Sequence, residues 1–559
     1  MIQYTDMQQL SDTLTSTVRS VFGAQDIAID LSLAEPQFGD FSCNVAMKLS
    51  KILGKSPLEI AEHIRAEMLN QNIEWLKEIV VAGPGFLNFT LTDAALWQQA
   101  ISEPLASLKG ESIVLEYSCP NAFKELHSGH LYQTLVGDVL GNMLIRAGAQ
   151  VTRTNFGGDV GLHVAKSMWG VFDLLQGFEI SKLEEMPRSE HASFLSKAYV
   201  HGATMYEQDE AVKLQVEGYN KQIYELHAND DSTSSFAKVY WLCRTWSYEY
   251  FKDFYESIEV SPFNRYYPES ETAPIGLDLV RSANGVFEQS DGATIFRGEA
   301  IGLHTRVFIT RENLPTYETK DLGVIKLEYD EFAFEQRILI TGNDQSEYMK
   351  VVFAAAEQVL PNVAHKMRHL TNGTIRFGDG QKMSSRLGNV SRAIDVIDGA
   401  SELVEADNDE LKKILSLGAV KYSFLKQRFG VDIAFDLEES VSLHGNSGPY
   451  LQYAYVRAHS ILQKAENLIV IPEFTASERL FVQKLSQFEI VMHSATQELA
   501  QQIICTYLYE LAQNFNRFYE DNRVLDDERQ SVRLMLVRRY ADILQDGLRV
   551  LGIRVPEKM

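Results

Sequence analysis

The chain has 559 residues, 45% of them hydrophobic, and its 52 Lys and Arg stand against 76 Asp and Glu, which gives a formal net charge of -24. This length and apolar content exclude a disordered acidic tail and a small disulfide scaffold. They predict about three or four domains, because a domain has roughly 100–200 residues. The acidity argues at first against a nucleic-acid partner, since affinity for phosphates comes from Lys and Arg.

The cysteines and the apolar runs indicate where the protein works. The 4 cysteines lie far apart and lack the spacing of a zinc site or of a dense disulfide framework. The first twenty residues lack the basic start and apolar stretch of a secretory signal. The longest apolar runs are far shorter than the ~20 residues that a membrane-spanning helix needs. We therefore expect a cytoplasmic protein without a metal site and without membrane contact.

Residues 1–108 are predicted to form an α+β domain. Apolar residues recur at helical spacing from Val45 to Ile64, and two β-rich runs then flank a turn at 83–85. Residues 109–400 are predicted to form a Rossmann-like α/β domain. An apolar run, a helical segment and a second β-rich run make a βαβ unit, which implies a parallel sheet; they lie at 113–119, 131–148 and 151–156.

A long segment at about 171–300 is predicted to be a helical insertion between two halves of this sheet. It holds 22 Asp and Glu against 11 Lys and Arg. Strand-like runs return at 305–310 and 337–342, and a helix follows at about 345–359. Helical periodicity dominates the rest of the chain, so 401–559 is predicted to be an all-α domain.

Two histidines and a glycine stand where the loop of the βαβ unit opens into its helix, in the order His127-Ser128-Gly129-His130. Residues three apart lie on one helix face, and the free N–H groups of a helix start favour phosphate. Gly129 has no side chain, so a flat nucleobase could lie against the backbone there. These residue types also meet by chance, so the motif alone is only suggestive.

A second motif, Lys382-Met383-Ser384-Ser385-Arg386, lies in the basic stretch 361–392, which carries six Lys and Arg against one Asp. A loop with two cations could close over a triphosphate and stabilise the charge that develops as pyrophosphate leaves. Taken alone, the motif is better explained as an exposed basic loop.

Together and in this order, the two motifs resemble the paired signatures of class I aminoacyl-tRNA synthetases. The surrounding residues narrow the resemblance to the arginyl-tRNA synthetase family, and it covers nearly the whole chain. The fold implied is a Rossmann-like catalytic domain with a helical insertion, an N-terminal α+β domain and a C-terminal helical anticodon-binding bundle. The similar stretches include QFGDFSCNVAMKLSK, VAGPGFLNFTL, EYSCPNAFKELHSGHLYQTLVGD, LPTYETKDLG, GNDQSEYMKVVFAA, QKMSSRLGNV and NSGPYLQYAYVRAHSIL.

The resemblance assigns roles to the two motifs. It implies that His127 and His130 contact the ATP phosphates, that Gly129 lies under the adenine, and that Lys382 binds phosphate. Arg386 stands where the class I signature ends in Lys, and Lys124 fits the lysine that compensates for this in many arginyl enzymes. The residues expected to bind ATP are His127, Gly129, His130, Lys382, Met383, Ser384, Ser385 and Arg386; the catalytic set is His127, His130, Lys124 and Lys382.

Arginine needs a pocket of its own, because a guanidinium is planar, always charged and best bound by a fixed carboxylate. Tyr317 and Asp321 match the guanidinium readers of the family, and Glu116 is a second carboxylate candidate. Without the family, Tyr317 and Asp321 would be an ordinary helix-face pair. The matches expected to hold the α-amino and carboxylate groups are Ser118, Asn121 and Gln345.

Candidates for tRNA contact lie at both ends of the chain. Stacking on an exposed ring is a usual way to hold an unpaired base, although tyrosines at helical spacing more often pack in a core. The C-terminal candidates are Asn446, Tyr450, Gln452, Tyr453 and Arg457, with a basic tail of Arg533, Arg538, Arg539, Arg549 and Arg554. The N-terminal candidates for the tRNA elbow are Phe38, Asn44 and Asn88.

One stretch departs from the family pattern. Where the family often has Gly-Asp-Trp-Gly with Gln soon after, Val160 replaces the Trp and His163 the Gln, while Asp159 and Gly161 remain. Roles at 160–163 are therefore not carried over.

The resemblance implies that the chain activates L-arginine with ATP and Mg²⁺, transfers it to tRNA(Arg) and works as a monomer. It also implies that activation needs bound tRNA. Three alternatives stay open: a class I synthetase for another amino acid, a small-molecule nucleotidyltransferase, and a non-catalytic RNA-binding relative. Much of the net charge lies in the acidic insertion, so we expect basic groups to line one continuous face opposite it.

Overall fold

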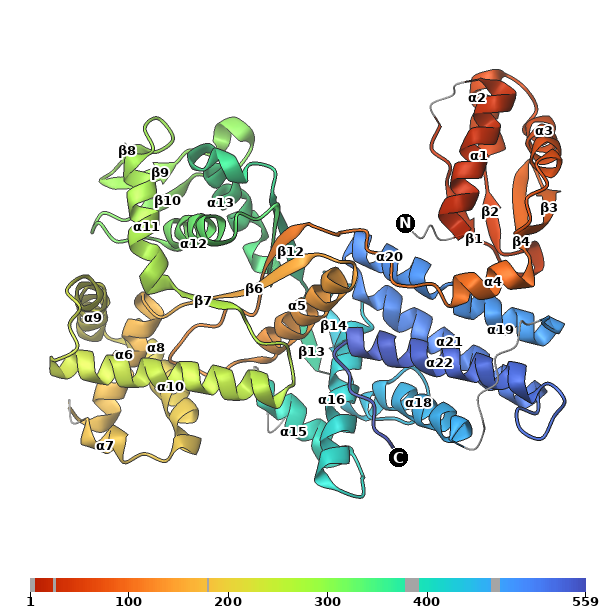
Figure 1. Cartoon of the computed structure of the whole chain (residues 1–559). Helices are drawn as coiled ribbons and strands as arrows, with labels where there is room; N and C mark the ends of the chain where they lie inside the picture. Colours follow the sequence, from red (N-terminus) through yellow and green to blue (C-terminus); the bar gives the residue numbers. More distant parts are fainter. Residues whose placement is uncertain (1–5, 24–26, 178–179, 378–391, 464–472) are drawn as a thin grey trace.

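The computed structural model describes residues 6–23, 27–177, 180–377, 392–463 and 473–559. These residues form an N-terminal α+β unit, a central unit around a parallel sheet, and a C-terminal helical bundle, so the expected fold class is confirmed (Figure 1). Among them, no helix is long and apolar enough to cross a membrane.

The N-terminal unit is a four-stranded antiparallel sheet in the order β1-β2-β4-β3, with helices packed on one face. Its buried residues alternate along the strands, as the pairs Phe41–Phe89 and Cys43–Leu87 show. Its elements are α1 (Asp6–Phe22), β1 (Leu31–Leu33), β2 (Phe41–Cys43), α2 (Val45–Leu53), α3 (Pro57–Asn70), β3 (Leu76–Ala82), β4 (Phe86–Leu91) and α4 (Asp93–Ala100).

A five-stranded parallel sheet in the order β12-β11-β5-β6-β7 forms the central unit. The chain runs from β5 through β6 to β7 on one side of β5, then crosses back to β11 and β12 on the other side. Such a reversal of strand order is a switch point, which opens a crevice at the carboxyl ends of the strands. The strands and the helices between them are β5 (Ser112–Glu116), α5 (Ser128–Arg146), β6 (Gln150–Gly157), β7 (Arg265–Pro268), α11 (Glu269–Ser282), α12 (Tyr317–Phe332), β11 (Gln336–Gly342), α13 (Ser346–Val359) and β12 (Met367–Asn372).

The insertion is shorter than the sequence predicted. Its helices end before β7, which pairs with residues Thr154–Gly157 of β6. The range 171–300 therefore contains a strand of the main sheet. The run at 305–310 also belongs elsewhere, because β10 pairs with β9 in a separate antiparallel sheet. The elements involved are α6 (Leu162–Leu175), α7 (Ser181–Glu184), α8 (His191–Gln208), α9 (Glu210–Ala228), α10 (Ser235–Ser257), β8 (Glu288–Ser290), β9 (Ala293–Phe296) and β10 (Arg306–Ile309).

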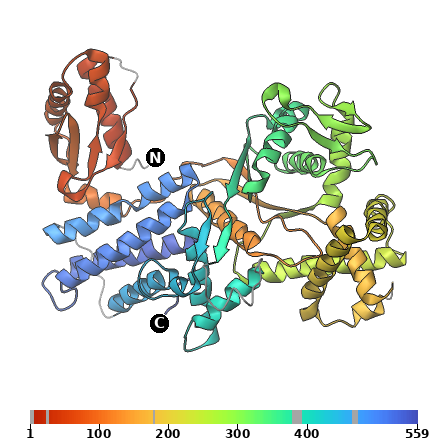
Figure 2. The ribbon, with the colours of Figure 1, turned by 180° about the vertical axis from the view of Figure 1, so that it is seen from behind.

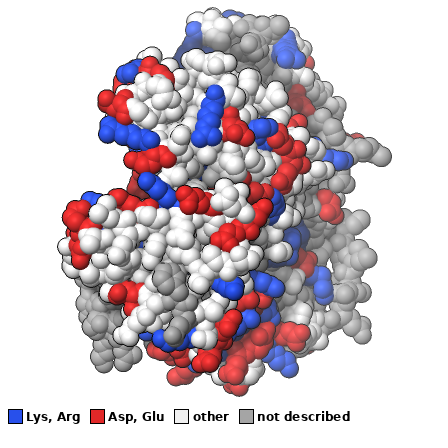
Figure 3. All heavy atoms as spheres, turned by 90° about the vertical axis from the view of Figure 1, so that its left-hand side faces the viewer, with Lys and Arg blue, Asp and Glu red and all other residues white. Residues whose placement is uncertain are grey.

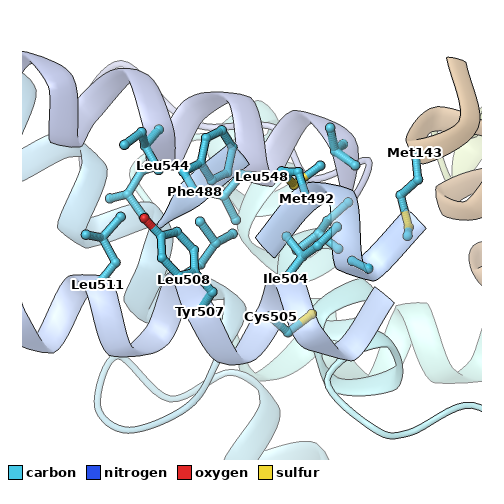
Figure 4. Packing of buried hydrophobic residues seen from close by; sticks show 14 of the residues in the cluster. Met143, Phe488, Met492, Ile504, Cys505, Tyr507, Leu508, Leu511, Leu544 and Leu548 are labelled. Carbon is cyan, nitrogen blue, oxygen red and sulfur yellow. The ribbon is translucent and has the colours of Figure 1, made fainter. Parts of the chain in front are cut away.

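The C-terminal helices pack against the same α5 that crosses the main sheet. Met143 of α5 points toward Met492 and Ile504 of two bundle helices, all of them buried (Figure 4). At the end of α5, the Arg146 guanidinium bonds Glu489 at 2.7 Å and Asp546 at 2.9 Å. The elements are β13 (Ile375–Phe377), α15 (Ala393–Leu403), α16 (Asp409–Leu425), β14 (Ile433–Phe435), α17 (Leu437–Ser440), α18 (Gly448–Leu462), α19 (Ala476–Ser486), α20 (Phe488–Glu498), α21 (Gln501–Asp521) and α22 (Gln530–Val550).

The N-terminal unit stands on one end of the bundle, where α4 lies along α19 (Figures 1 and 2). Arg479 of α19 holds this contact: its guanidinium bonds the Asp40 carboxylate at 2.7 Å, the Asp93 carboxylate at 2.5 Å and the Leu91 carbonyl at 3.0 Å. Asp40 is buried, so it depends on Arg479 for its counter-charge.

The charges are less segregated than the sequence suggested. On the face that carries the insertion, Lys and Arg lie interspersed with Asp and Glu (Figure 3). Arginines of the C-terminal tail already have partners within the protein: Arg533 pairs with Glu478, Arg549 with Asp546, and Arg554 with Glu259 and Glu410. These carboxylates partly neutralise arginines that were expected to face RNA. A continuous basic face stays a prediction.

Candidate active site at the carboxyl ends of the strands

The loop after β5 brings the predicted residues into the crevice of the sheet. Ser118 and Cys119 have φ values of 71° and 42°, in the left-handed region that few non-glycine residues adopt. Such backbone strain concentrates at functional sites, where surrounding contacts impose it. Here the Ser118 hydroxyl is held from two sides, by Thr134 of α5 and Tyr255 of α10, each at 2.8 Å.

The two histidines cap the start of α5 with their own side chains. Nδ1 of His127 accepts from the Gly129 N–H at 3.1 Å, and Nδ1 of His130 accepts from the His127 N–H at 3.3 Å. Because both Nδ1 atoms accept, each neutral ring carries its proton on Nε2. The ring centroids are 3.8 Å apart, so the pair presents two oriented donors at a helix N-terminus.

Both imidazoles are neutral at physiological pH. Burial, aided by the charge of Lys124, lowers the pKa of His127 to about 4. Burial also holds the pKa of His130 well below its usual value, with His127 and Lys124 adding to the shift. Burial likewise lowers the pKa of Lys124, whose ammonium lies 5.2 Å from the ring centroid of Tyr199.

Gly129 is required by the histidines themselves. A Cβ at this position would lie 2.9 Å from Cε1 and from Nδ1 of His127. From the sequence, this glycine was expected to leave room for a nucleobase. The structure adds a second reason, because any larger residue at 129 would contact the His127 ring.

Tyr317 and Asp321 stand one turn apart at the start of α12, as predicted for a pair on one helix face. The Asp321 carboxylate is buried and accepts a hydrogen bond from the Tyr348 hydroxyl of α13. Burial raises the pKa of Asp321 to about 7, against the Tyr348 hydrogen bond and the charge of Arg337, which lower it. Tyr317 is 52% exposed, so its ring faces solvent at the start of this helix.

Sequence reasoning missed a second carboxylate beside this pair. Glu269 begins α11, is buried, and binds the ammonium of Lys320, which itself lies 4.3 Å from the ring centroid of Tyr317. Burial raises the pKa of Glu269, although Lys320 counteracts this. No motif marks Glu269, because the long insertion separates it from the other site residues in the sequence.

Glu116 has a partner that the sequence did not reveal. Its carboxylate binds the guanidinium of Arg337, which is fully buried on β11 and also binds Glu328 of α12. Burial raises the pKa of Glu116, and the charge of Arg337 opposes this shift. Glu116 thus lies beneath the pocket and is engaged within the protein.

The segment 159–163, which differs in part from the family pattern, supports α11. The buried Asp159 carboxylate accepts from the Ser270 N–H at 2.9 Å and from Arg244 at 2.7 Å, and it thereby fixes the helix that begins with Glu269. The His163 Nε2–H donates to the Gly158 carbonyl at 3.2 Å, and burial, with the charge of Lys320, lowers the pKa of His163 to about 3. Val160 is fully buried and packs in the core of the insertion.

Two predicted ligand-binding residues lie at the rim. Asn121 forms a parallel bridge with Gly158, and its Oδ1 lies 2.3 Å from where a Gly158 Cβ would be, so this glycine admits the Asn121 side chain. Gln345 is exposed in the 3-10 turn that precedes α13. The second motif, with Lys382, Met383, Ser384, Ser385 and Arg386, lies outside the described residues.

The tRNA candidates divide into exposed and engaged residues. Phe38 and Tyr453 are 51% and 45% exposed. Asn88 is instead buried on the N-terminal sheet, and its side chain accepts from Ser42 at 2.8 Å, so the prediction that it faces tRNA is contradicted by its burial. The other C-terminal candidates bond within the bundle: Gln452 is buried and donates to the Arg554 carbonyl, Tyr450 and Arg457 share Asn516, and Asn446 accepts from Tyr422. Asn44 of the N-terminal unit has a buried Oδ1 without a hydrogen-bond partner among the described residues.

Among the described residues, no group of three or more His, Cys, Asp or Glu could hold a metal ion. A cavity of about 740 Å³ does lie away from the histidines, between α5, α22 and the C-terminal tail.

Similarity to known proteins covers the whole chain. Residues 92–437 match the family described as tRNA synthetases class I (R), catalytic domain; 8–91 match an arginyl tRNA synthetase N terminal domain, and 451–559 match a DALR anticodon binding domain. Proteins named arginine–tRNA ligase are 27% identical in Bacteroides thetaiotaomicron, over 99% of this chain and 100% of the relative, and 28% identical in Picosynechococcus, over 99% of each.

Solved structures share the fold. The arginyl-tRNA synthetase of Thermus thermophilus superposes with a TM-score of 0.80 at 22% identity, over 99% of each chain. That of Plasmodium falciparum gives 0.79 at 20% identity, over 100% of each chain. Because the catalytic-domain family spans more than half of the chain, the resemblance found in the sequence is confirmed: this chain is an aminoacyl-tRNA synthetase enzyme and belongs to the class I arginyl-tRNA synthetase family.

Proposed function

We propose that this chain is an arginine–tRNA ligase, which activates L-arginine with ATP and transfers it to the 3′-terminal ribose of tRNA(Arg). One observation carries the choice of amino acid: the buried Asp321 carboxylate, held by Tyr348, lies beside Tyr317 and the buried Glu269. A permanently charged guanidinium is the side chain that such a cluster of carboxylates favours.

In the first step, the arginine carboxylate attacks the α-phosphate of ATP in line and pyrophosphate leaves. His127 and His130 stabilise the charge on the phosphate oxygens through their Nε2–H groups, as neutral donors that are already oriented before the substrate binds. Lys124 adds a positive charge nearby, and Lys382 supplies a second one from the 378–391 segment. Positioning and charge stabilisation carry the rate, with little acid–base chemistry, and Mg²⁺ enters as part of the ATP substrate.

In the arginine pocket, Asp321 and Tyr317 read the guanidinium. Glu269 has a supporting role, because Lys320 occupies its carboxylate. Asn121 and Gln345 orient the α-amino and carboxylate groups from the rim. Ser118 is fully buried and supports them by fixing the loop after β5 through Thr134 and Tyr255. We assign Glu116 a supporting role, because Arg337 occupies its carboxylate.

The tRNA is held at two places. The exposed Phe38 of the N-terminal domain contacts its elbow, and the start of α18, with Tyr450, Tyr453 and Arg457, contacts its anticodon arm. Activation requires the bound tRNA, and the chain works in the cytoplasm as a monomer. We keep the domain boundaries 1–108, 109–400 and 401–559, with the helical insertion ending before β7.

ATP–pyrophosphate exchange tests this function, with each of the twenty amino acids offered separately to the full chain, with and without total tRNA. We expect exchange with arginine alone, and only when tRNA is present. Exchange with lysine, glutamine or glutamate and none with arginine would overturn the choice of amino acid. Binding of tRNA without any adenylate would instead support a non-catalytic RNA-binding protein. Light scattering of the purified chain tests the monomer.

A further inference from the structure

A protein guanidinium lies buried under the pocket that is proposed to bind a substrate guanidinium. Arg337 has no exposed surface and lies at the start of β11, next to the central strand β5. Its Nε bonds Glu328 at 2.5 Å and its Nη2 bonds Glu116, while its Nη1 is buried without a hydrogen-bond partner among the described residues. Burying a charged arginine is costly unless its partners are fixed, so this site needs both carboxylates.

The partners of Arg337 belong to the two walls of the pocket. Glu116 ends β5, directly before the strained loop that carries Ser118 and Asn121. Glu328 lies on α12, where the Thr154 hydroxyl of β6 donates to its second oxygen at 2.6 Å. Asp321 lies seven residues earlier on the same helix, which is two turns and therefore the same face. Arg337 thus holds together β5, which leads to the residues proposed for the α-amino and carboxylate groups, and α12, which carries the proposed guanidinium reader Asp321.

We propose that Arg337 is a positioning residue for arginine recognition, which locks β5 to α12 through Glu116 and Glu328 and provides the positive charge behind Asp321. This inference rests on the proposed arginine specificity. Arg337 touches no substrate in this role, because Glu116 and Glu328 enclose its guanidinium.

The charges around Asp321 make this role necessary. The groups that act on its carboxyl are Tyr348 from α13, Glu318 from α12, Glu269 from α11, and Arg337 from β11. Glu116, from β5, interacts with Asp321 as a further like charge. Two of these carboxylates have their own cations, since Lys320 pairs with Glu269 and Arg306 with Glu318. Arg337 is the cation that acts on the Asp321 carboxyl itself. Without Arg337, burial and like charges would protonate Asp321, and a protonated carboxyl no longer attracts a guanidinium.

Two substitutions separate charge from geometry. Arg337→Met removes the charge, so the pKa of Asp321 rises further and the acidic limb of kcat/KM for arginine moves to higher pH by about one unit. We expect KM for arginine to rise about tenfold or more at pH 7, while KM for ATP changes less than twofold. Arg337→Lys keeps the charge but loses the fork that binds two carboxylates, so KM rises while the acidic limb stays within about half a unit.

Arg146→Met is the matched control. Arg146 is also a buried arginine between two carboxylates, Glu489 and Asp546, but it lies at the far end of α5. Both Met variants should lower the melting temperature, and only Arg337→Met should change KM for arginine and the pH profile. If Arg337→Met does not fold, Arg337→Lys tests the positioning role on its own, through the expected rise in KM for arginine.

Parent-like KM for arginine and a parent-like pH profile in both Arg337 variants would overturn the positioning role. If the unmodified chain did not activate arginine at all, the proposed function itself would fail, which is a different result.

Discussion

Replacing Asp321 by Asn is the sharpest test of the arginine pocket. Asn has the same shape and still accepts the hydrogen bond from Tyr348, so only the negative charge is lost. Leaving the bound guanidinium without its buried partner costs about 3–5 kcal/mol. At about 1.4 kcal/mol per factor of ten, kcat/KM for arginine should fall by about 10²- to 10³-fold or more. KM for ATP should stay within about twofold, because the histidine pair is untouched.

The same variant should be more stable than the parent at alkaline pH. The folded-state pKa of Asp321 is about 7 and the model value is 3.8, so the folded protein holds a proton that the unfolded chain releases between these values. Stability therefore falls as pH rises from 3.8 to about 7, and above that range the cost is on the order of 4 kcal/mol. Asp321→Asn removes this dependence, which thermal unfolding at pH 5 and pH 8 would measure.

Pyrophosphate exchange with tRNA present measures the activity, and Asp330→Asn is the control. Asp330 lies on the same helix but is exposed and forms a surface pair with Lys326, so its loss should change neither KM nor stability by much. A KM for arginine within threefold of the parent in Asp321→Asn would remove Asp321 from the pocket.

Three further changes probe other parts of the chain. His130→Ala should slow adenylate formation by about 10²- to 10³-fold in single-turnover assays, since one oriented donor is lost; a loss under fivefold would contradict its role. Gly129→Ala should displace the His127 ring, which lies 2.9 Å from the new Cβ, and lower kcat by about tenfold or more without loss of helix stability. Unchanged kcat would show that the ring can move freely. Arg479→Met leaves Asp40 buried without its cation, so limited proteolysis should release the N-terminal domain faster and unfolding should cost about 3 kcal/mol less; equal protease resistance would refute this.

Local sequence patterns were sufficient to predict the parts of the candidate site whose geometry depends on residues close together in the chain. His127 and His130 were predicted to lie at the start of a helix after a buried strand, and they do so. Their side-chain caps of this helix, which the sequence analysis did not predict, also involve only residues within four positions. The α13 helix was placed within one residue of its start, and Tyr317 and Asp321 share a helix face as predicted.

Contacts between distant segments could not be predicted in this way. Glu269 and Arg337 complete the site from elements that carry no motif, and their partners lie 51 and 221 residues away. The strand β7 has only 4 residues, which is too short for the alternation of apolar and polar residues to be recognised within a helical segment. Asn88 is buried against Ser42 of the neighbouring strand β2, a contact between residues 46 positions apart that no local pattern predicts.

The helix α5 begins at the histidine pair and ends in the contacts of Arg146 with the C-terminal bundle. Its 19 residues make a rod about 28 Å long, without a proline that could bend it. A lever of this length that tilts by about 5° moves its far end by about 2 Å, a distance that decides whether a donor reaches a phosphate oxygen. The chain thus has a mechanical connection through which anticodon contact at one end could set the alignment of the histidines at the other.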